Sequence, residues 1–172
     1  YAALALAVLP PVVLMLLGSV LQIGTYAAPM LAAFLQIPVL VEYGPRWAML
    51  LYTAAAVLAL LLVPETELAL FYLLAVGYYP ALRGILERVR PAVLRWGLKL
   101  LVFNAGTALV YLLLFALLGP AVGRELLQDG PAALALLLAL GNLSFVFYDR
   151  ALAVLTRCYR TVWRKKIKFF RR

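Results

Sequence analysis

Histidine is absent from this chain of 172 residues, and cysteine occurs once, as Cys158. Without histidine the chain has no Ser-His nucleophilic site and no histidine-based zinc site, and one cysteine excludes an intrachain disulfide. The sequence also lacks a GxxxxGK[ST] phosphate loop and any acidic cluster inside an apolar run. ATP chemistry by that route and carboxylate-held metals are therefore excluded. We expect a protein that is not an enzyme and that carries no cofactor and no metal.

Charged side chains are scarce, at 13% of the chain, and only 7 residues are acidic. Hydrophobic residues make up 67%, and the mean hydropathy is +1.02, far from the roughly half-apolar composition of soluble domains. Six spans of about 20 residues each would nearly account for the length. The composition therefore predicts an all-α integral membrane protein with six transmembrane helices, multi-pass in the cell membrane.

Six apolar runs separated by short connections support this count. The expected spans cover about 3–22, 26–41, 47–63, 68–82, 92–118 and 131 onwards. Pro91 and Pro131 stand where the fifth and sixth spans start, and proline suits the first turn of a helix because its missing N–H would be unpaired there anyway. We expect one transmembrane domain, residues 1–156, followed by a basic cytoplasmic tail, residues 157–172.

Positive charge in the interior of the chain collects between the fourth and fifth runs. The cations there are Arg83, Arg88, Arg90, Arg95 and Lys99. Lys and Arg are retained on the cytoplasmic side of membrane spans, so this segment should lie inside. Alternation then puts Arg46 and the tail from Arg150 inside as well, and leaves Arg124 as the one outside cation among 16. Both termini are predicted to be cytoplasmic, with Asp149 and Arg150 as a local pair or topology determinant at the inner boundary.

The net charge of +9 resembles a nucleic-acid signal, but the cations sit at span ends, where anionic lipid headgroups are the nearer partner. We therefore expect contacts with membrane lipids and none with nucleic acid. In the tail, apolar and basic residues fall on separate helical stripes, as in an amphipathic helix at the membrane interface. This extension is either a lipid anchor or a docking element for a partner. Cys158 within it is either a packing residue or a palmitoyl acceptor.

Polar side chains inside the apolar runs are the main lead to function, because each costs free energy in lipid and normally faces protein or a cavity. Several are predicted to lie in the outer half of the membrane or near its middle. They are Ser19, Gln22, Tyr72, Tyr111 and Asn142. Their common depth predicts one outward-facing substrate-binding pocket. For Asn142 an alternative carries equal weight, a hydrogen bond across helices such as membrane asparagines commonly make, which would also involve Asn104.

Ala3 and Ala7 stand four residues apart and give the first span a smooth face that allows close helix approach. With the six-span layout, the turn at 42–46 (EYGPR) and the segment at 77–84 (GYYPALRG), this face resembles the S-component superfamily, the substrate-binding subunits of energy-coupling factor (ECF) transporters. The resemblance covers nearly the whole chain. It implies a subunit that captures a micronutrient from outside and joins a membrane coupling protein and two cytoplasmic ABC ATPases for release inside.

The same resemblance implies that Ala3 and Ala7 contact the coupling protein, and that the outer connections around 24–26 and 65–67 close over the ligand. Polar groups in the expected pocket are few, so the ligand should be small and largely apolar or aromatic. The alternative is a non-transport membrane scaffold of the cell envelope, in which the basic tail and the interior basic segment dock a partner. A ligand found in the purified protein would separate these two functions.

The predicted orientation can be tested by cysteine labelling in a Cys158→Ser background. Gln128→Cys should react with a membrane-impermeant maleimide in intact cells, whereas Arg90→Cys should react only after permeabilisation, because clustered cations stay inside. Labelling of Arg90→Cys from the outside alone would overturn the whole topology.

Overall fold

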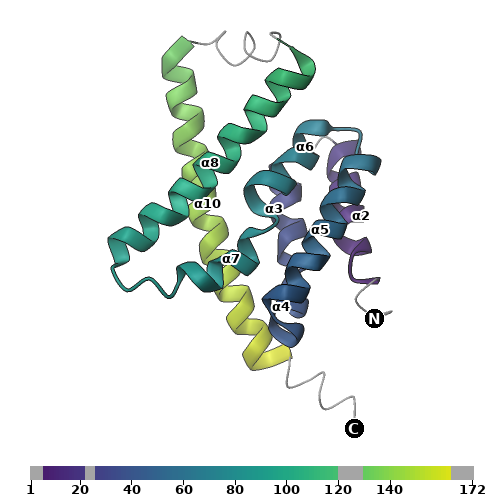
Figure 1. Ribbon diagram of the computed structural model, residues 1–172, viewed down its shortest axis with the longest axis vertical. Coiled ribbons are helices and arrows are strands. Elements are labelled where there is room, and N and C mark those ends of the chain that lie inside the picture. Colours follow the sequence, from purple (N-terminus) through teal and green to yellow (C-terminus); the bar gives the residue numbers. More distant parts are fainter. Residues whose placement is uncertain (1–5, 22–25, 120–129, 164–172) are drawn as a thin grey trace.

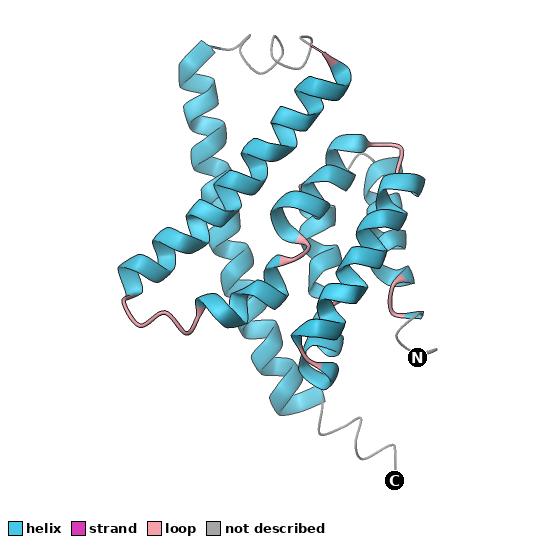
Figure 2. Cartoon of the chain, viewed as in Figure 1, coloured by secondary structure: helices cyan, strands magenta, loops and turns pink. Residues whose placement is uncertain are grey.

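The computed structural model describes residues 6–21, 26–119 and 130–163, and every regular element in these ranges is a helix (Figures 1 and 2). This confirms the all-α prediction for the described residues. Ala3, Gln22 and the tail beyond Trp163 lie outside them. The number of spans and their orientation in the membrane stay predictions.

Four helical segments are long and apolar enough to cross a membrane. They are α5 (Pro45–Leu62), the combined segment Thr66–Leu86, α8 (Ala92–Leu118), and α10 (Gly130–Cys158) continued by the π-helical turn η2 (Tyr159–Trp163). The segment Thr66–Leu86 consists of α6 (Thr66–Phe71), the π-helical turn η1 (Tyr72–Val76) and α7 (Tyr79–Leu86). Four such helices indicate a membrane protein, as predicted.

Two shorter apolar segments precede these four. They are α2 (Leu9–Leu21), and α3 (Ala27–Phe34) followed by α4 (Ile37–Tyr43). Helix α2 begins at Leu9, so Pro10 and Pro11 both fall in its first turn. Proline lacks an N–H, and the first turn of a helix is the place where that donor is not needed.

The turn between α4 and α5 depends on Gly44, whose φ of 91° lies in the left-handed region that favours glycine. Pro45 follows as the first residue of α5. The junction lies at the same end of the molecule as the end of α7 and the end of α10, while α6 begins at the opposite end (Figure 1). Successive helices that run in opposite directions require this arrangement.

Small side chains dominate the buried contacts between the N-terminal helices. Fully buried alanines are Ala32, Ala33, Ala48, Ala55, Ala56 and Ala59. Large apolar side chains instead point outward along the long helices, as Leu112 on α8 and Phe147 on α10 do at more than 60% exposure. In water this distribution would be unfavourable, but in lipid outward leucines cost nothing and small residues allow close packing.

Helix α8 passes close to the backbone of η1 at Gly106. A Cβ atom added at Gly106 would lie 2.2 Å from the carbonyl oxygen of Leu74 and 3.0 Å from Cα of Ala75. Both atoms belong to the backbone of η1, so a rotamer change cannot relieve the overlap. Only glycine fits at this point, and the contact fixes the depth at which α8 crosses η1.

Gly106→Ala should therefore destabilise the fold, by about 1–3 kcal/mol, because the added methyl overpacks the contact with η1. Gly97→Ala on the same helix is the matched control, since nothing lies within 4 Å of its added Cβ. Alanine there should stabilise the helix by up to about 1 kcal/mol. Thermal unfolding of both variants in detergent gives the comparison, and equal shifts in Tm would contradict the close approach.

Candidate functional site

A cavity of about 330 Å³ lies between the start of α3, the end of α6, α8 and α10. Most of its wall is apolar, with Met30, Phe71 and Phe103 on one side and leucines of α10 on the other. The polar groups at its wall are Tyr26, Asn104, Thr107, Tyr111 and Ser144. A cavity of this volume with few polar groups has the character of a small-molecule site.

Three side chains from three elements meet at one edge of the cavity. The hydroxyl of Tyr26 donates a hydrogen bond of 2.7 Å to Oε1 of Glu67, and the hydroxyls of Tyr26 and Tyr111 are 2.8 Å apart. Tyr111 also donates to the same carboxylate oxygen at 3.4 Å. The connections that the family resemblance assigns to closure over the ligand thus contact each other through Tyr26 and Glu67.

Asn142 forms a reciprocal pair with Asn104 across α8 and α10. Nδ2 of Asn104 donates to Oδ1 of Asn142 at 2.7 Å, and the opposite hydrogen bond measures 3.2 Å. Each amide also donates at 2.8 Å to a carbonyl of its own helix, at Leu100 and Leu138. The expected cross-helix hydrogen bond is therefore present, while Asn104 lines the cavity and Asn142 stands behind it. A ligand role for Asn142 stays a prediction.

Thr107 is a buried polar group at the wall. No described residue hydrogen-bonds to its Oγ1 atom. A buried hydroxyl without a hydrogen bond is uncommon and calls for an explanation, such as a functional role. Thr107 is absent from the predicted site, although its spacing of three from Asn104 and four from Tyr111 puts all three on one helical face. That spacing was the signal in the sequence.

Tyr72 and Ser19, which were also predicted for the site, do not line the cavity. The hydroxyl of Tyr72 is fully buried and accepts a hydrogen bond of 2.9 Å from Nε2 of Gln36. Ser19 is half-buried on α2 and does not line the wall. Gln22 falls outside the described residues, as does Ala3. Ala7, the other predicted partner-binding residue, is half-buried and packs against the protein's own core.

A buried ion cluster, which the sequence analysis did not anticipate, joins α7, α8 and α10. Nζ of Lys99 lies 3.0 Å from both carboxylate oxygens of Asp149 and 2.6 Å from Oε1 of Glu87. Asp149 also accepts hydrogen bonds from Nε of Arg83 at 2.9 Å and from the hydroxyl of Tyr79 at 2.6 Å. Lys99 and Asp149 are 1% and 2% exposed.

The expected local pair of Asp149 and Arg150 is therefore wrong. The guanidinium of Arg150 instead lies 5.7 Å from the ring centroid of Trp96. Asp149 and Arg150 are adjacent on a helix and point in different directions, since successive side chains are about 100° apart. Asp149 faces the protein and Arg150 faces outward.

Glu87 lies between α7 and α8, at the exposed side of this cluster. The pKa of its carboxyl is below the ordinary value, chiefly because Lys99 donates a hydrogen bond to the ionised form. A carboxyl with a lowered pKa stabilises the fold above its ordinary pKa, and this contribution is lost as pH falls through the lowered value. Glu87 is therefore ionised at neutral pH and shares the charge of Lys99 with Asp149.

Lys99→Met should remove the central cation and leave Asp149 buried with fewer partners. We expect a loss of about 3–5 kcal/mol in the free energy of unfolding. Arg95→Met is the control, because Arg95 is half-buried and makes one contact of 3.7 Å with Glu87, for which we expect about 0–1 kcal/mol. The double variant Lys99→Met/Asp149→Leu should recover part of the loss. Equal thermal stability of the two single variants would refute the cluster as a stabilising element.

An aromatic layer separates the cavity from the ion cluster. The rings of Phe103 and Phe145 stack with centroids 4.5 Å apart, and Tyr79 packs edge-on against Phe145 at 4.9 Å. Phe103 lines the cavity while Tyr79 bonds Asp149, so the layer lies between the cavity and the ions.

Comparison of the chain with protein-family models, curated proteins and solved structures found no match.

Proposed function

We propose that the protein is a membrane-embedded binding subunit that captures a small, largely apolar ligand in the cavity between α3, α6, α8 and α10. The observation that carries this proposal is the unpartnered hydroxyl of Thr107 at the wall of an otherwise apolar cavity of about 330 Å³. Apolar walls supply affinity, and a few placed polar groups orient the ligand. Thr107 supplies one such group, and Tyr111 and Asn104 lie on the same face of α8.

The aromatic layer supports a subunit that works with a partner. Phe103 and Phe145 close the cavity toward the predicted cytoplasmic side, so a ligand that enters from outside cannot leave inward unless α8 and α10 move apart. The sequence has no phosphate loop to power such a movement. This fits the S-component role that the family resemblance implies, in which a coupling protein and two cytoplasmic ABC ATPases drive release.

In this proposal the chain crosses the cell membrane six times with both termini inside, and the cavity opens to the outer half. The first and second spans are then α2 and the α3–α4 segment, of which α2 has 13 described helical residues. A membrane scaffold would have no need of a cavity with an unpartnered hydroxyl. The cavity is thus the feature that favours ligand binding over the scaffold alternative.

Filling the cavity tests this function without knowledge of the ligand. Gly141 lines the cavity and its added Cβ would meet nothing within 4 Å, so Gly141→Leu should occupy ligand space without disturbing the fold. Small molecules extracted from purified protein should include a species whose amount falls about tenfold or more in this variant. A loss of about 1.4 kcal/mol in binding free energy already lowers the affinity by that factor. Mass spectrometry of the extracts makes the measurement.

Gly97→Leu is the matched control, since Gly97 is exposed on α8 and lines no described cavity. It should retain the extracted species at the wild-type level. Thr107→Val should also reduce retention while leaving thermal stability unchanged or higher, because it removes a buried, unpaired hydroxyl. An identical set of small molecules in wild type, Gly141→Leu and Gly97→Leu would rule out the cavity as a ligand site.

A further inference from the structure

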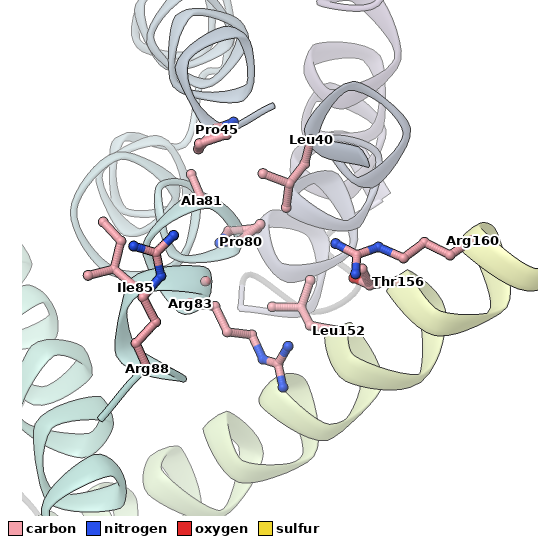
Figure 3. A pocket seen from close by; sticks show the side chains of 11 residues that line it. Leu40, Pro45, Pro80, Ala81, Arg83, Ile85, Arg88, Leu152, Thr156 and Arg160 are labelled. Carbon is pink, nitrogen blue, oxygen red and sulfur yellow. The ribbon is translucent and has the colours of Figure 1, made fainter. Parts of the chain in front are cut away.

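A second cavity, of about 350 Å³, lies at the end of the molecule where α4 meets α5, α7 ends and α10 passes into η2 (Figure 3). Three arginines from two sides line it, Arg83 and Arg88 on one side and Arg160 on the other. Thr156 adds a hydroxyl at the α10 side, and Figure 3 shows the side chain of Arg160 extending back along α10 toward it. The ion cluster contacts this cavity only through Arg83.

The three arginines differ in what already holds them. Arg83 is fixed by Asp149 through Nε and by Glu87 through Nη2 at 3.1 Å, which leaves Nη1 with both of its donors. In the described part of the chain, no carboxylate lies within ion-pair distance of Arg88 or Arg160. At this cavity one guanidinium is thus already held by carboxylates, and the other two have none within ion-pair distance among the described residues.

The charge balance around the cavity is positive. In the ion cluster, Lys99, Arg83 and Arg95 face two carboxylates, those of Glu87 and Asp149, which leaves one cation in excess. Arg88 and Arg160 add two further positive charges at the cavity wall. An anion with about two negative charges would be held there in a site that contains no competing carboxylate among its described lining residues.

Guanidinium groups select among anions by shape. The planar fork of arginine matches two oxygens of a phosphate group at once, and a phosphate offers three or more such oxygens. Apart from Thr156, the rest of the wall is apolar, with Leu40, Ile85 and Leu152 among the lining side chains, which suits a group attached to carbon. Inorganic or esterified phosphate fits these features better than a small halide ion does.

We propose that this arginine-lined cavity is a binding site for a phosphate group, supplied by a phospholipid headgroup or by a soluble phosphate compound. Both sources present the same chemistry to Arg83, Arg88 and Arg160. The site is separate from the apolar cavity at the other side of the aromatic layer, and its existence does not depend on the function proposed for that cavity. The predicted topology places it at the cytoplasmic face, where both sources occur.

The test compares two double variants of equal net charge. Arg88→Gln/Arg160→Gln removes two arginines that line the cavity. Arg90→Gln/Arg157→Gln removes two exposed arginines that do not line the cavity, although Arg90 is close to Arg88 in the sequence and Arg157 is close to Arg160. The full-length chain in a neutral detergent is titrated with inorganic phosphate and, separately, with short-chain phosphatidic acid, and binding is followed by microscale thermophoresis.

Wild type and the Arg90/Arg157 variant should bind at least one of the two probes with equal affinity. The Arg88/Arg160 variant should bind that probe with an affinity at least about tenfold lower, because charge-assisted hydrogen bonds are lost. Binding of phosphatidic acid alone identifies a lipid source, and binding of both probes identifies a soluble phosphate. Equal affinities of the two double variants, or no binding of either probe to wild type, would overturn the proposal. If the Arg88/Arg160 variant lacks a thermal transition, Arg160→Gln against Arg157→Gln gives the same comparison.

Discussion

The ion pair between Lys99 and Asp149 is the interaction on which the arrangement of the C-terminal helices depends. In the apolar parts of α8 and of the segment Gly130–Trp163, only 22% and 6% of the residues are buried within the protein, so leucine packing holds these helices together weakly. In lipid there is no hydrophobic drive for helices to associate, and packing with polar contacts must supply it. A buried pair that also engages Glu87 and Arg83 ties α7, α8 and α10 at one depth.

From this pair, further contacts follow at helical spacing along the antiparallel helices. Phe103, four residues after Lys99, stacks on Phe145, four residues before Asp149. Asn104 then pairs with Asn142. Beyond this point α8 and α10 diverge (Figure 1), and the apolar cavity lies there. The crossing that the ion pair fixes therefore also sets the position of the cavity.

Gly106 adds a second constraint, because it lets the backbone of η1 come close to α8. A π-helical turn shifts the register of the helix that contains it, and such turns are frequent at functional sites. Here η1 follows α6, whose Phe71 lines the apolar cavity and whose Glu67 bonds Tyr26 at its edge, and it precedes α7, which supplies Arg83 to the arginine-lined cavity. The register of this one segment sets the positions of side chains in both cavities.

The sequence predicted the class of fold and most helix limits, because hydropathy and proline placement are local properties. The fifth span was expected up to about Leu118, and α8 ends there. Hydropathy does not determine which face of a helix meets which neighbour, however. Asp149 binds Lys99, 50 residues away, and Arg83, 66 residues away, and a pairing at that distance along the chain leaves no periodic signal.

For the candidate site, too, the sequence predicted position along a span but not the direction in which a side chain points. Tyr111 and Asn142 were predicted from depth, and both lie at or beside the cavity, because depth follows from position along a span. Depth alone also selected Tyr72, whose hydroxyl faces Gln36 in the core. Thr107 was recoverable only from its spacing with Asn104 and Tyr111. Rotation about the helix axis is set by packing between helices, which one sequence does not record.

The cost of separating α8 from α10 bears directly on the proposed role as a partnered subunit. Inward release past Phe103 and Phe145 would part the helices that Lys99 and Asp149 join, and exposing one half of a buried pair costs about 3–5 kcal/mol. Couplings between a ligand and a conformational change are typically about 1–3 kcal/mol. A ligand in the apolar cavity would then be too weak to open the inner side by its own binding. Under the proposed function, the work would come from outside this chain, as expected of a capture subunit that relies on partner ATPases.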